Sequence, residues 1–199
     1  MVKKAGSKEG RSLPGSPSRP HPLSELPSWD ASSGLLHVVV DTPKGSVIKF
    51  KVDLEKGCYT ISHLLPPGAV FPFDFDSIPS TSAADGDPVD VLILMEKASF
   101  AGCLVPVRLI GVLEANQTQE GKTNRNDRLI GVAAESRAYR ELRALEDVPK
   151  NLLKEIEHFF VSYNEERGRV FKVLGRFGPA RAARLVRAGE RRFQYRNTS

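Results

Sequence analysis

The sequence contains very little cysteine and no long apolar run. Its 199 residues include two cysteines, Cys58 and Cys103, far apart and outside any CxxC pair. They fit reduced thiols in a cytoplasmic protein better than a disulfide framework. No apolar stretch approaches the ~18 residues of a membrane-spanning helix, and the basic N-terminus lacks the apolar segment of a secretory signal. We therefore expect a cytoplasmic protein that does not contact a membrane.

The sequence also lacks the patterns of several common catalytic sites. It has no GxSxG motif, and its four histidines form neither an HxxxH pair nor a cluster with cysteine, so neither a serine hydrolase nor a zinc enzyme is indicated. Residues 121–123 resemble the end of a P-loop, but the earlier glycine is absent and an apolar strand follows where a helix is needed. A calcium-binding EF-hand beginning at Asp85 is excluded because Asp90 occupies the position that requires glycine.

The overall composition is that of a globular protein with an uneven distribution of charge. Hydrophobic residues make up 40% and charged residues 27%, which excludes wholesale disorder. Residues 31–127 carry eight Lys or Arg and twelve Asp or Glu, whereas residues 128–199 carry sixteen and nine. This distribution argues against a uniform nucleic-acid-binding face and suits a site where carboxylates hold a metal cation and basic groups hold an anion. A solvated surface is the simpler interpretation of the charge alone.

The composition divides the chain into two regions. Residues 1–27 are rich in Gly, Ser, Pro and Lys, with almost no large apolar side chains, so we expect a flexible tail. Residues 28–199 are expected to form a single domain, which is long enough to bury roughly 70% of its unfolded surface.

Hydrophobic periodicity places strands mainly in the middle of the chain and helices near its end. Alternating or continuous apolar segments predict strands at residues 35–41, 48–53, 58–61, 70–75, 89–95, 104–114, 128–133 and 170–174. Apolar residues at helical spacing predict helices at 150–166 and 179–193. Strands followed by helices indicate an α+β fold with a closed or nearly closed antiparallel sheet.

The strongest chemical signal is the segment Asp85-Gly86-Asp87-Pro88-Val89-Asp90, which opens an apolar strand. Three carboxylates within six residues repel one another unless a cation lies between them. Pro88 restricts Asp87 to an extended conformation, and Asp90 lies within an apolar run, where an unpaired carboxylate is costly. Hard oxygen ligands of this kind suit Mg²⁺. The alternative interpretation is a polar turn before a strand.

The segment DGDPVDVLIL, together with VVVDTPKGSVIKFKVD and EIEHFFVSYNEERGRVFKVLGR, resembles the soluble family I inorganic pyrophosphatases. The resemblance covers roughly residues 35–177. It implies an OB-like five-stranded antiparallel β-barrel flanked by helices. It also implies a homo-oligomer that hydrolyses inorganic diphosphate to two phosphates, with Mg²⁺ activating the attacking water.

The resemblance further implies a role for each matching residue. Asp87 is expected to be the base that deprotonates the attacking water. The expected metal ligands are Asp85, Asp90, Asp41, Asp127 and Glu120. The expected phosphate-binding residues are Lys49, His63, Arg128 and Tyr163. Within the loop at 117–127 the register is ambiguous, and we expect Asp127, rather than Asn126, to complete the metal site because only a carboxylate adds negative charge.

Several positions depart from the family pattern. His63 stands where the family usually carries an arginine, Lys51 stands at an acidic position, and Phe71 and Phe75 replace two tyrosines of the site. These departures and the basic final third keep an alternative open, in which a catalytically weakened pyrophosphatase-like protein binds a nucleotide or RNA. Because the aspartates are retained as a full set, the enzyme is favoured and nucleic acid is not the expected partner.

Overall fold

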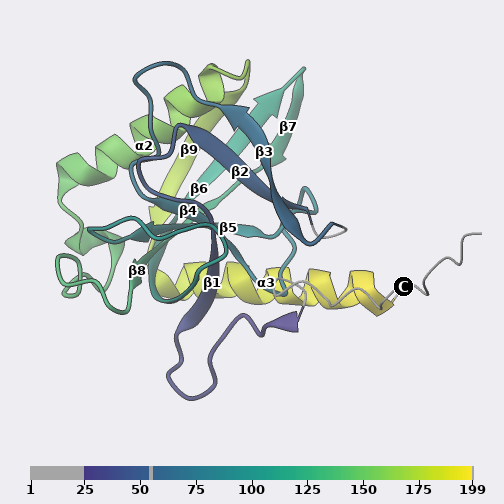
Figure 1. The fold of residues 1–199 in the computed structure, drawn as a ribbon, viewed down its shortest axis with the longest axis vertical. Helices are drawn as coiled ribbons and strands as arrows, with labels where there is room; N and C mark the ends of the chain where they lie inside the picture. The colour runs from purple at the N-terminus through teal and green to yellow at the C-terminus, as the bar shows by residue number, and fades with distance from the viewer. Residues whose placement is uncertain (1–24, 54–55, 199) are drawn as a thin grey trace, which may run out of the picture.

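The structure is a computed structural model that describes residues 25–53 and 56–198 (Figure 1). The expected flexible tail at 1–27 lies mostly outside the described residues. Its end is in contact with the fold, since Leu26 packs against Val39 and Val52 and its carbonyl accepts a 2.7 Å hydrogen bond from Ser80 Oγ. None of the helices in the described part of the chain is long and apolar enough to cross a membrane.

The described residues form strands first and most of the helical structure afterwards. The strands are β1 Leu36–Thr42, β2 Ile48–Asp53, β3 Cys58–Leu64, β4 Asp74–Ile78, β5 Val89–Leu94, β6 Leu104–Gln119, β7 Lys122–Arg125, β8 Arg128–Ala133 and β9 Val170–Phe177. The helices are the short 3-10 helix η1 Leu145–Asp147, α2 Lys150–Glu165 and α3 Pro179–Thr198.

Five strands close into a ring in the order β1-β4-β5-β8-β6, because β6 pairs back onto β1. The pairing of β5 with β8 is parallel and the other four pairings are antiparallel. The expected OB-like barrel and α+β class are therefore confirmed, but the sheet is mixed and not wholly antiparallel. Strands β7 and β9 extend the long strand β6, and β2 with β3 forms a separate two-stranded sheet (Figure 1).

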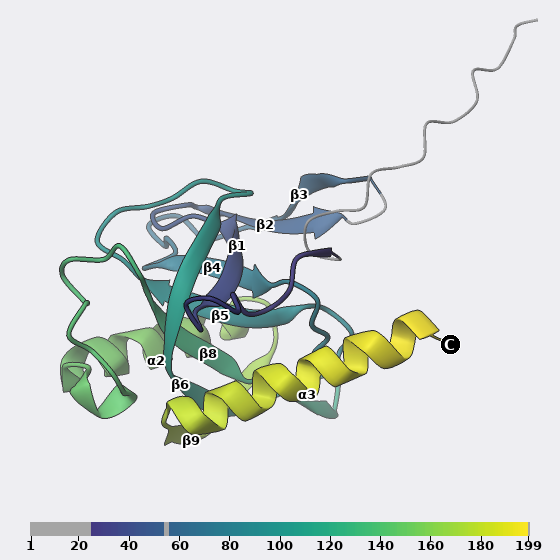
Figure 2. The same ribbon diagram turned by 90° about the horizontal axis from the view of Figure 1, so that it is seen from below.

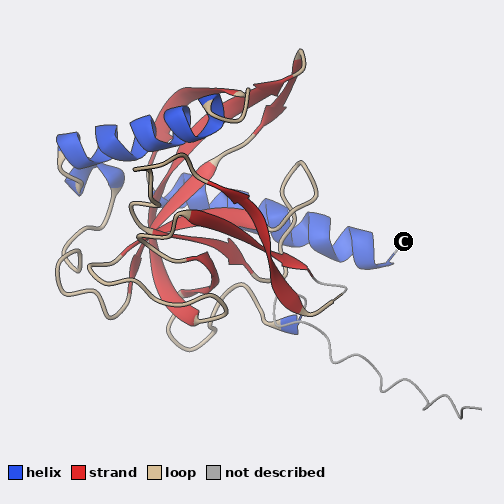
Figure 3. Ribbon diagram, turned by 45° about the horizontal axis from the view of Figure 1, so that its top comes forward, coloured by secondary structure: helices blue, strands red, loops and turns tan. Residues whose placement is uncertain are grey.

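Helices α2 and α3 cover different faces of this barrel (Figures 1 and 3). On β5, Leu92 and Leu94 pack in the cluster that includes α2, whereas Val91 and Ile93 pack in the cluster that includes Ala182 of α3. This alternation follows from the strand geometry, in which successive side chains point to opposite faces. Both faces of β5 are buried, which explains why its sequence is almost continuously apolar.

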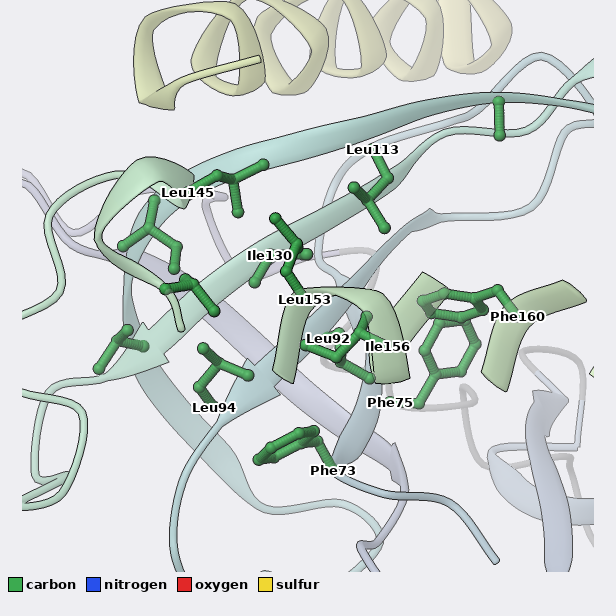
Figure 4. Close-up of a cluster of buried hydrophobic side chains, with 14 of the residues drawn as sticks. Phe73, Phe75, Leu92, Leu94, Leu113, Ile130, Leu145, Leu153, Ile156 and Phe160 are labelled. Atoms are coloured by element: carbon green, nitrogen blue, oxygen red, sulfur yellow. The ribbon is translucent and has the colours of Figure 1, made fainter. Parts of the chain in front are cut away.

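Helix α2 forms over nearly the predicted residues because its apolar side chains recur at helical spacing. Leu153, Ile156 and Phe160 are buried and pack against Leu92 and other residues of the sheet, as Figure 4 shows. The chain enters the helix from Pro149 and leaves it before Gly168, whose φ of 65° ends the helical conformation.

Three differences from the sequence expectations have physical reasons. The strand expected at 70–75 lies at 74–78, because Phe71 and Phe73 are buried from a loop and not from a strand. Strand β7, with the sequence KTNR, was not expected, since it contains no apolar residue. Helix α3 continues to Thr198 and not to 193, through polar residues that give no apolar periodicity.

Candidate active site

One cleft of about 670 Å³ gathers most of the residues that the sequence singled out. Its acidic residues are Asp41, Asp53, Asp85, Asp87 and Asp90, and its basic residues are Lys49, Lys51, Arg128, Arg167 and Arg169. They come from β1, β2, the loop before β5, the start of β5, the start of β8 and the segment after α2. The barrel thus brings the acidic middle of the sequence together with its basic final third.

The loop before β5 supplies two aspartates that differ in their contacts. Lys51 Nζ on β2 lies 2.9 and 3.0 Å from the two carboxylate oxygens of Asp87, and both side chains are more than half exposed. Asp85 Oδ1 accepts a 3.2 Å hydrogen bond from the backbone N–H of Asp87, and partial burial raises the pKa of Asp85. No basic side chain in the described part of the chain forms an ion pair with Asp85.

Asp41 and Lys49 form the buried floor of the cleft. Ser77 Oγ donates a 2.5 Å hydrogen bond to Asp41 Oδ2. Burial raises the pKa of Asp41 to about 6, although the charge of Lys49 and the Ser77 hydroxyl oppose the increase. Burial likewise lowers the pKa of Lys49, and the nearby carboxylates of Asp41 and Asp90 oppose that decrease. The protonation states of this pair are therefore coupled through space.

Arg128 connects the aspartate segment to the aromatic core. Its side chain is 7% exposed and forms an ion pair with Asp90. The guanidinium carbon lies 5.4 Å from the ring centre of Phe75 and 5.5 Å from that of Phe160. The ring of Phe75 also contacts Lys49, whose Nζ lies 4.1 Å from the ring centre. One aromatic ring thus contacts both cations of the cleft floor.

Tyr163 separates the cleft from a neighbouring apolar pocket of about 360 Å³ that contains His63. The two ring centres are 5.4 Å apart, and Arg167 donates a 3.3 Å hydrogen bond to the Tyr163 hydroxyl. Burial, with Arg167, Lys49 and Arg169 nearby, lowers the pKa of His63 to about 4. His63 is therefore neutral at pH 7 and stands behind Tyr163, outside the residues that line the cleft.

The loop at 117–127 does not present its two acids to the cleft. Gln117 and Asn126 line the cleft and are joined by a 2.8 Å hydrogen bond. Asp127 faces a smaller adjoining cavity of about 130 Å³ that it shares with Asp85 and Asp90. Its Oδ1 accepts hydrogen bonds from Arg125 Nε at 2.5 Å and from the backbone N–H of Ala115 at 3.0 Å.

Glu120 lies apart from the other expected ligands. It is exposed at the tip of the β6–β7 hairpin, where its φ of 50° helps to form the turn. The lining residues of the cleft do not include it. The structure therefore brings Asp41, Asp85 and Asp90 together in the cleft, places Asp127 beside them, and leaves Glu120 outside.

The oxygen atoms of the cleft fit a divalent cation. Asp41 Oδ1 is buried and has no hydrogen-bond partner in the described part of the chain, a costly state that a cation would relieve. Asp85 supplies a second carboxylate without a basic partner, and hard cations prefer such ligands. In the described ranges no three His, Cys, Asp or Glu side chains form a metal-holding group, so a bound cation would have to draw the carboxylates together.

Several residues that line the cleft were not found from the sequence, among them two arginines and an asparagine. Arg167 and Arg169 flank Gly168, and Asn164 lies one residue after Tyr163. The available signal was the pair of arginines on either side of the glycine that follows α2, the first of them one helical turn after Tyr163, which the sequence had already assigned to the site. Basic residues near a helix end are common for other reasons, so the pattern alone does not indicate a site.

Comparison with known proteins gives a consistent result. The family described as "Inorganic pyrophosphatase" matches residues 38–194. An inorganic pyrophosphatase of Geobacillus stearothermophilus is 33% identical over 152 residues, covering 76% of this chain and 90% of that protein. The crystal structure of the inorganic pyrophosphatase from Thermus thermophilus matches with a TM-score of 0.77 and 32% identity, covering 86% of this chain and 98% of the other. A structure from Neisseria gonorrhoeae gives the same TM-score at 26% identity, covering 87% and 99% of the two chains.

Proposed function

Because the chain belongs to the inorganic pyrophosphatase family, we propose that its cleft hydrolyses inorganic diphosphate to two phosphate ions. The observation that carries the proposal is the meeting of Asp85, Asp87 and Asp90 with Lys49 and Arg128 in one cleft. Diphosphate is a small polyanion, and its cleavage requires both positive charge for the phosphates and an activated water. The proteins found by comparison give no support to the nucleotide- or RNA-binding alternative.

Enzymes of this family depend on metal ions, and for this chain we propose Mg²⁺. Asp41, Asp85 and Asp90 would hold it, with Asp127 reaching the site from the adjoining cavity. Mg²⁺ bound there supplies charge neutralisation for the phosphates and acidifies a water molecule. The support for this assignment is the oxygen-only donor set and the unpartnered buried oxygen of Asp41.

The remaining residues of the cleft act on the substrate directly in this proposal. Lys49 and Arg128 present positive charge to the phosphate oxygens, and the Tyr163 hydroxyl and Arg167, which also line the cleft, donate hydrogen bonds. Asp87 accepts the proton of the attacking water. Its carboxylate already receives two contacts from Lys51, but an ionised carboxylate has about four acceptor positions, so Lys51 orients this base without saturating it.

Two further properties complete the proposal. The reduced cysteines and the nature of the substrate favour a cytoplasmic location. We also propose a homo-oligomer, and the exposed apolar side chains on β9, among them Val170 at 63% and Leu174 at 48%, are candidates for its interface. Analytical ultracentrifugation measures the oligomeric state directly, and a single species at the monomer mass would contradict this part of the proposal.

Release of phosphate from diphosphate, measured over a range of Mg²⁺ concentrations, tests the proposed function. We expect release that rises with Mg²⁺ and disappears when a chelator removes it. A matched assay with a nucleoside triphosphate in place of diphosphate tests whether the cleft is selective for the small substrate. No release of phosphate from diphosphate at any Mg²⁺ concentration would count against the proposal.

A further inference from the structure

The C-terminal half of α3 lies against the loop that carries Asp85 and Asp87 (Figure 2). The backbone N–H of Ser82 donates a 3.1 Å hydrogen bond to the carbonyl of Gly189. A Cβ atom at Gly189 would lie 2.8 Å from Val89 Cγ2 and 3.2 Å from Thr81 Cβ. Glycine is therefore required at this position for the helix to approach the loop so closely.

Two arginines, one and two turns further along α3, bind the backbone of the same loop. Arg192 Nε donates a 2.8 Å hydrogen bond to the carbonyl of Ser82. Arg196 Nη1 donates one of 2.9 Å to the carbonyl of Gly86 and one of 3.2 Å to Ser82 Oγ. Residues at positions 189, 192 and 196 share one face of a helix, so glycine and both arginines form a continuous contact with the loop.

Arg192 and Arg196 bind the backbone and the Ser82 hydroxyl of the loop and not its aspartate side chains. Both guanidinium groups bond to carbonyl oxygens, and neither forms an ion pair with Asp85 or Asp87 in the described part of the chain. An arginine bonded to one of these carboxylates would compete with a cation for it. Bonds to the backbone instead hold the loop in place without occupying either carboxylate, so Asp85 has no basic partner in the described residues and Asp87 has only Lys51. A hydrogen bond from a charged group is also stronger than one between neutral groups.

From these contacts we propose that Arg192 and Arg196 are positioning residues of the active site, which hold the loop so that Asp85 and Asp87 face the cleft. The inference rests on the proposed function for its catalytic consequence. Most of the loop's other restraints are internal, namely hydrogen bonds from Ala83 N–H to the Asp87 carbonyl, from Gly86 N–H to the Ala83 carbonyl and from Asp87 N–H to Asp85 Oδ1. The contact of Lys51 with the Asp87 carboxylate joins it to β2. Its geometry thus depends on a helix more than ninety residues away in the sequence.

The test replaces both arginines in the full chain, as Arg192→Ala with Arg196→Ala. Partners that orient metal ligands typically contribute ~10–100-fold to metal affinity or activity. We therefore expect the double variant to bind Mg²⁺ at least ~10-fold more weakly in calorimetry without diphosphate, and to lose kcat to a similar degree. Arg184→Ala is the matched control, because Arg184 is exposed on the same helix and forms no hydrogen bond or ion pair in the described residues.

Further measurements distinguish a role of the two arginines in positioning the loop from a general contribution to the stability of the protein. Arg196→Lys retains one donor for the Gly86 carbonyl, so it should recover most of the Mg²⁺ affinity that Arg196→Ala loses. A double variant with a lower melting temperature but an unchanged Mg²⁺ isotherm and unchanged kcat would overturn the inference, as would equal losses in Arg184→Ala.

Amide hydrogen exchange keeps this test independent of the proposed function. The amides of Ala83 and Gly86 should exchange several-fold faster in the double variant than in the wild type or in Arg184→Ala. If the wild-type protein released no phosphate, the proposed function would fail while the exchange data still decided whether the arginines hold the loop. Unchanged exchange at both amides would refute the positioning role in either case.

Discussion

Phe75 contributes to the cleft through its aromatic ring and not through a hydrogen bond. The resemblance assigns this position to a tyrosine, yet phenylalanine cannot donate a hydrogen bond to a phosphate. In the structure its ring contacts Lys49 Nζ at 4.1 Å and the Arg128 guanidinium at 5.4 Å. Attraction between each cation and the ring face contributes ~0.5–2 kcal/mol. The aromatic position thus supports the two basic groups that would bind the phosphates.

The role of Asp87 can be tested by a nearly isosteric change. Removing a positioned general base typically lowers the rate by ~10²–10⁴, so Asp87→Asn should reduce diphosphate hydrolysis at neutral pH by at least ~100-fold. Mg²⁺ binding, measured by calorimetry, should change much less than in Asp85→Asn. Glu155→Gln, at an exposed site on α2, controls for the loss of one negative charge. Near-normal hydrolysis with lost Mg²⁺ binding would identify Asp87 as a ligand and place the base elsewhere.

In the metal-free protein, titration of Asp41 makes the free energy of unfolding depend on pH. Its pKa is raised from 3.8 to about 6 in the folded protein, so between these values the folded state binds more protons than the unfolded chain. The free energy of unfolding therefore decreases as the pH rises from about 4 to 6, by up to about 3 kcal/mol from this group. His63, whose pKa is lowered to about 4, acts in the opposite direction.

Urea unfolding in the presence of a chelator, at pH 4.5, 5.5 and 6.5, measures this effect. Asp41→Asn removes one titrating group and leaves His63 unchanged, so its unfolding free energy should decrease less, or increase, over the same interval. Identical pH profiles for the two proteins would show that Asp41 does not titrate in this range.

At the scale of the elements, the sequence predicts where individual strands and helices lie, because their positions depend on local pattern. It does not predict which strands pair with one another or in which direction. Strand β2 was predicted at its observed residues 48–53 because polar and apolar side chains alternate there. The parallel pairing of β5 with β8 could not be foreseen, since two apolar runs carry no information on their relative direction. For the same reason the aspartate cluster was found as a motif, whereas Arg192 and Arg196 were not, because only the packing of α3 brings them to it.

The turn between β7 and β8 offers an element-scale test of the metal site. Asn126 lines the cleft, but Asp127 carries the negative charge and borders the adjoining cavity with Asp85 and Asp90. Only charge attracts a divalent cation strongly, so Asp127→Asn should weaken activation by Mg²⁺ strongly and Asn126→Ala only slightly. Titration of phosphate release against Mg²⁺ compares the two variants. Reversed effects would show that the cation binds on the Asn126 side of the turn.

At the scale of the whole molecule, folding converts an uneven charge distribution along the sequence into a balanced one in space. Residues 31–127 have more acids than bases and residues 128–199 have the opposite excess. In the fold, Arg128, Arg167 and Arg169 line the same cleft as the aspartates. The cleft consequently contains the charges for both a cation and a polyanion, and these are the two partners that hydrolysis of diphosphate brings together.

Binding of a cation in this cleft should stabilise the entire protein, because a ligand that binds only the folded state shifts the unfolding equilibrium. At a free Mg²⁺ concentration of 100 times its dissociation constant, the stabilisation is ~2.7 kcal/mol. For a domain of this size, ~1 kcal/mol corresponds to roughly 2–4 °C, so the melting temperature should rise by roughly 5–10 °C. Differential scanning calorimetry measures the shift, with KCl at equal ionic strength as the control for screening. Asp85→Asn should abolish most of it, since Asp85 has no basic partner in the described part of the chain and its loss leaves no buried cation unpaired. A full shift retained in Asp85→Asn would place the stabilising cation outside the cleft.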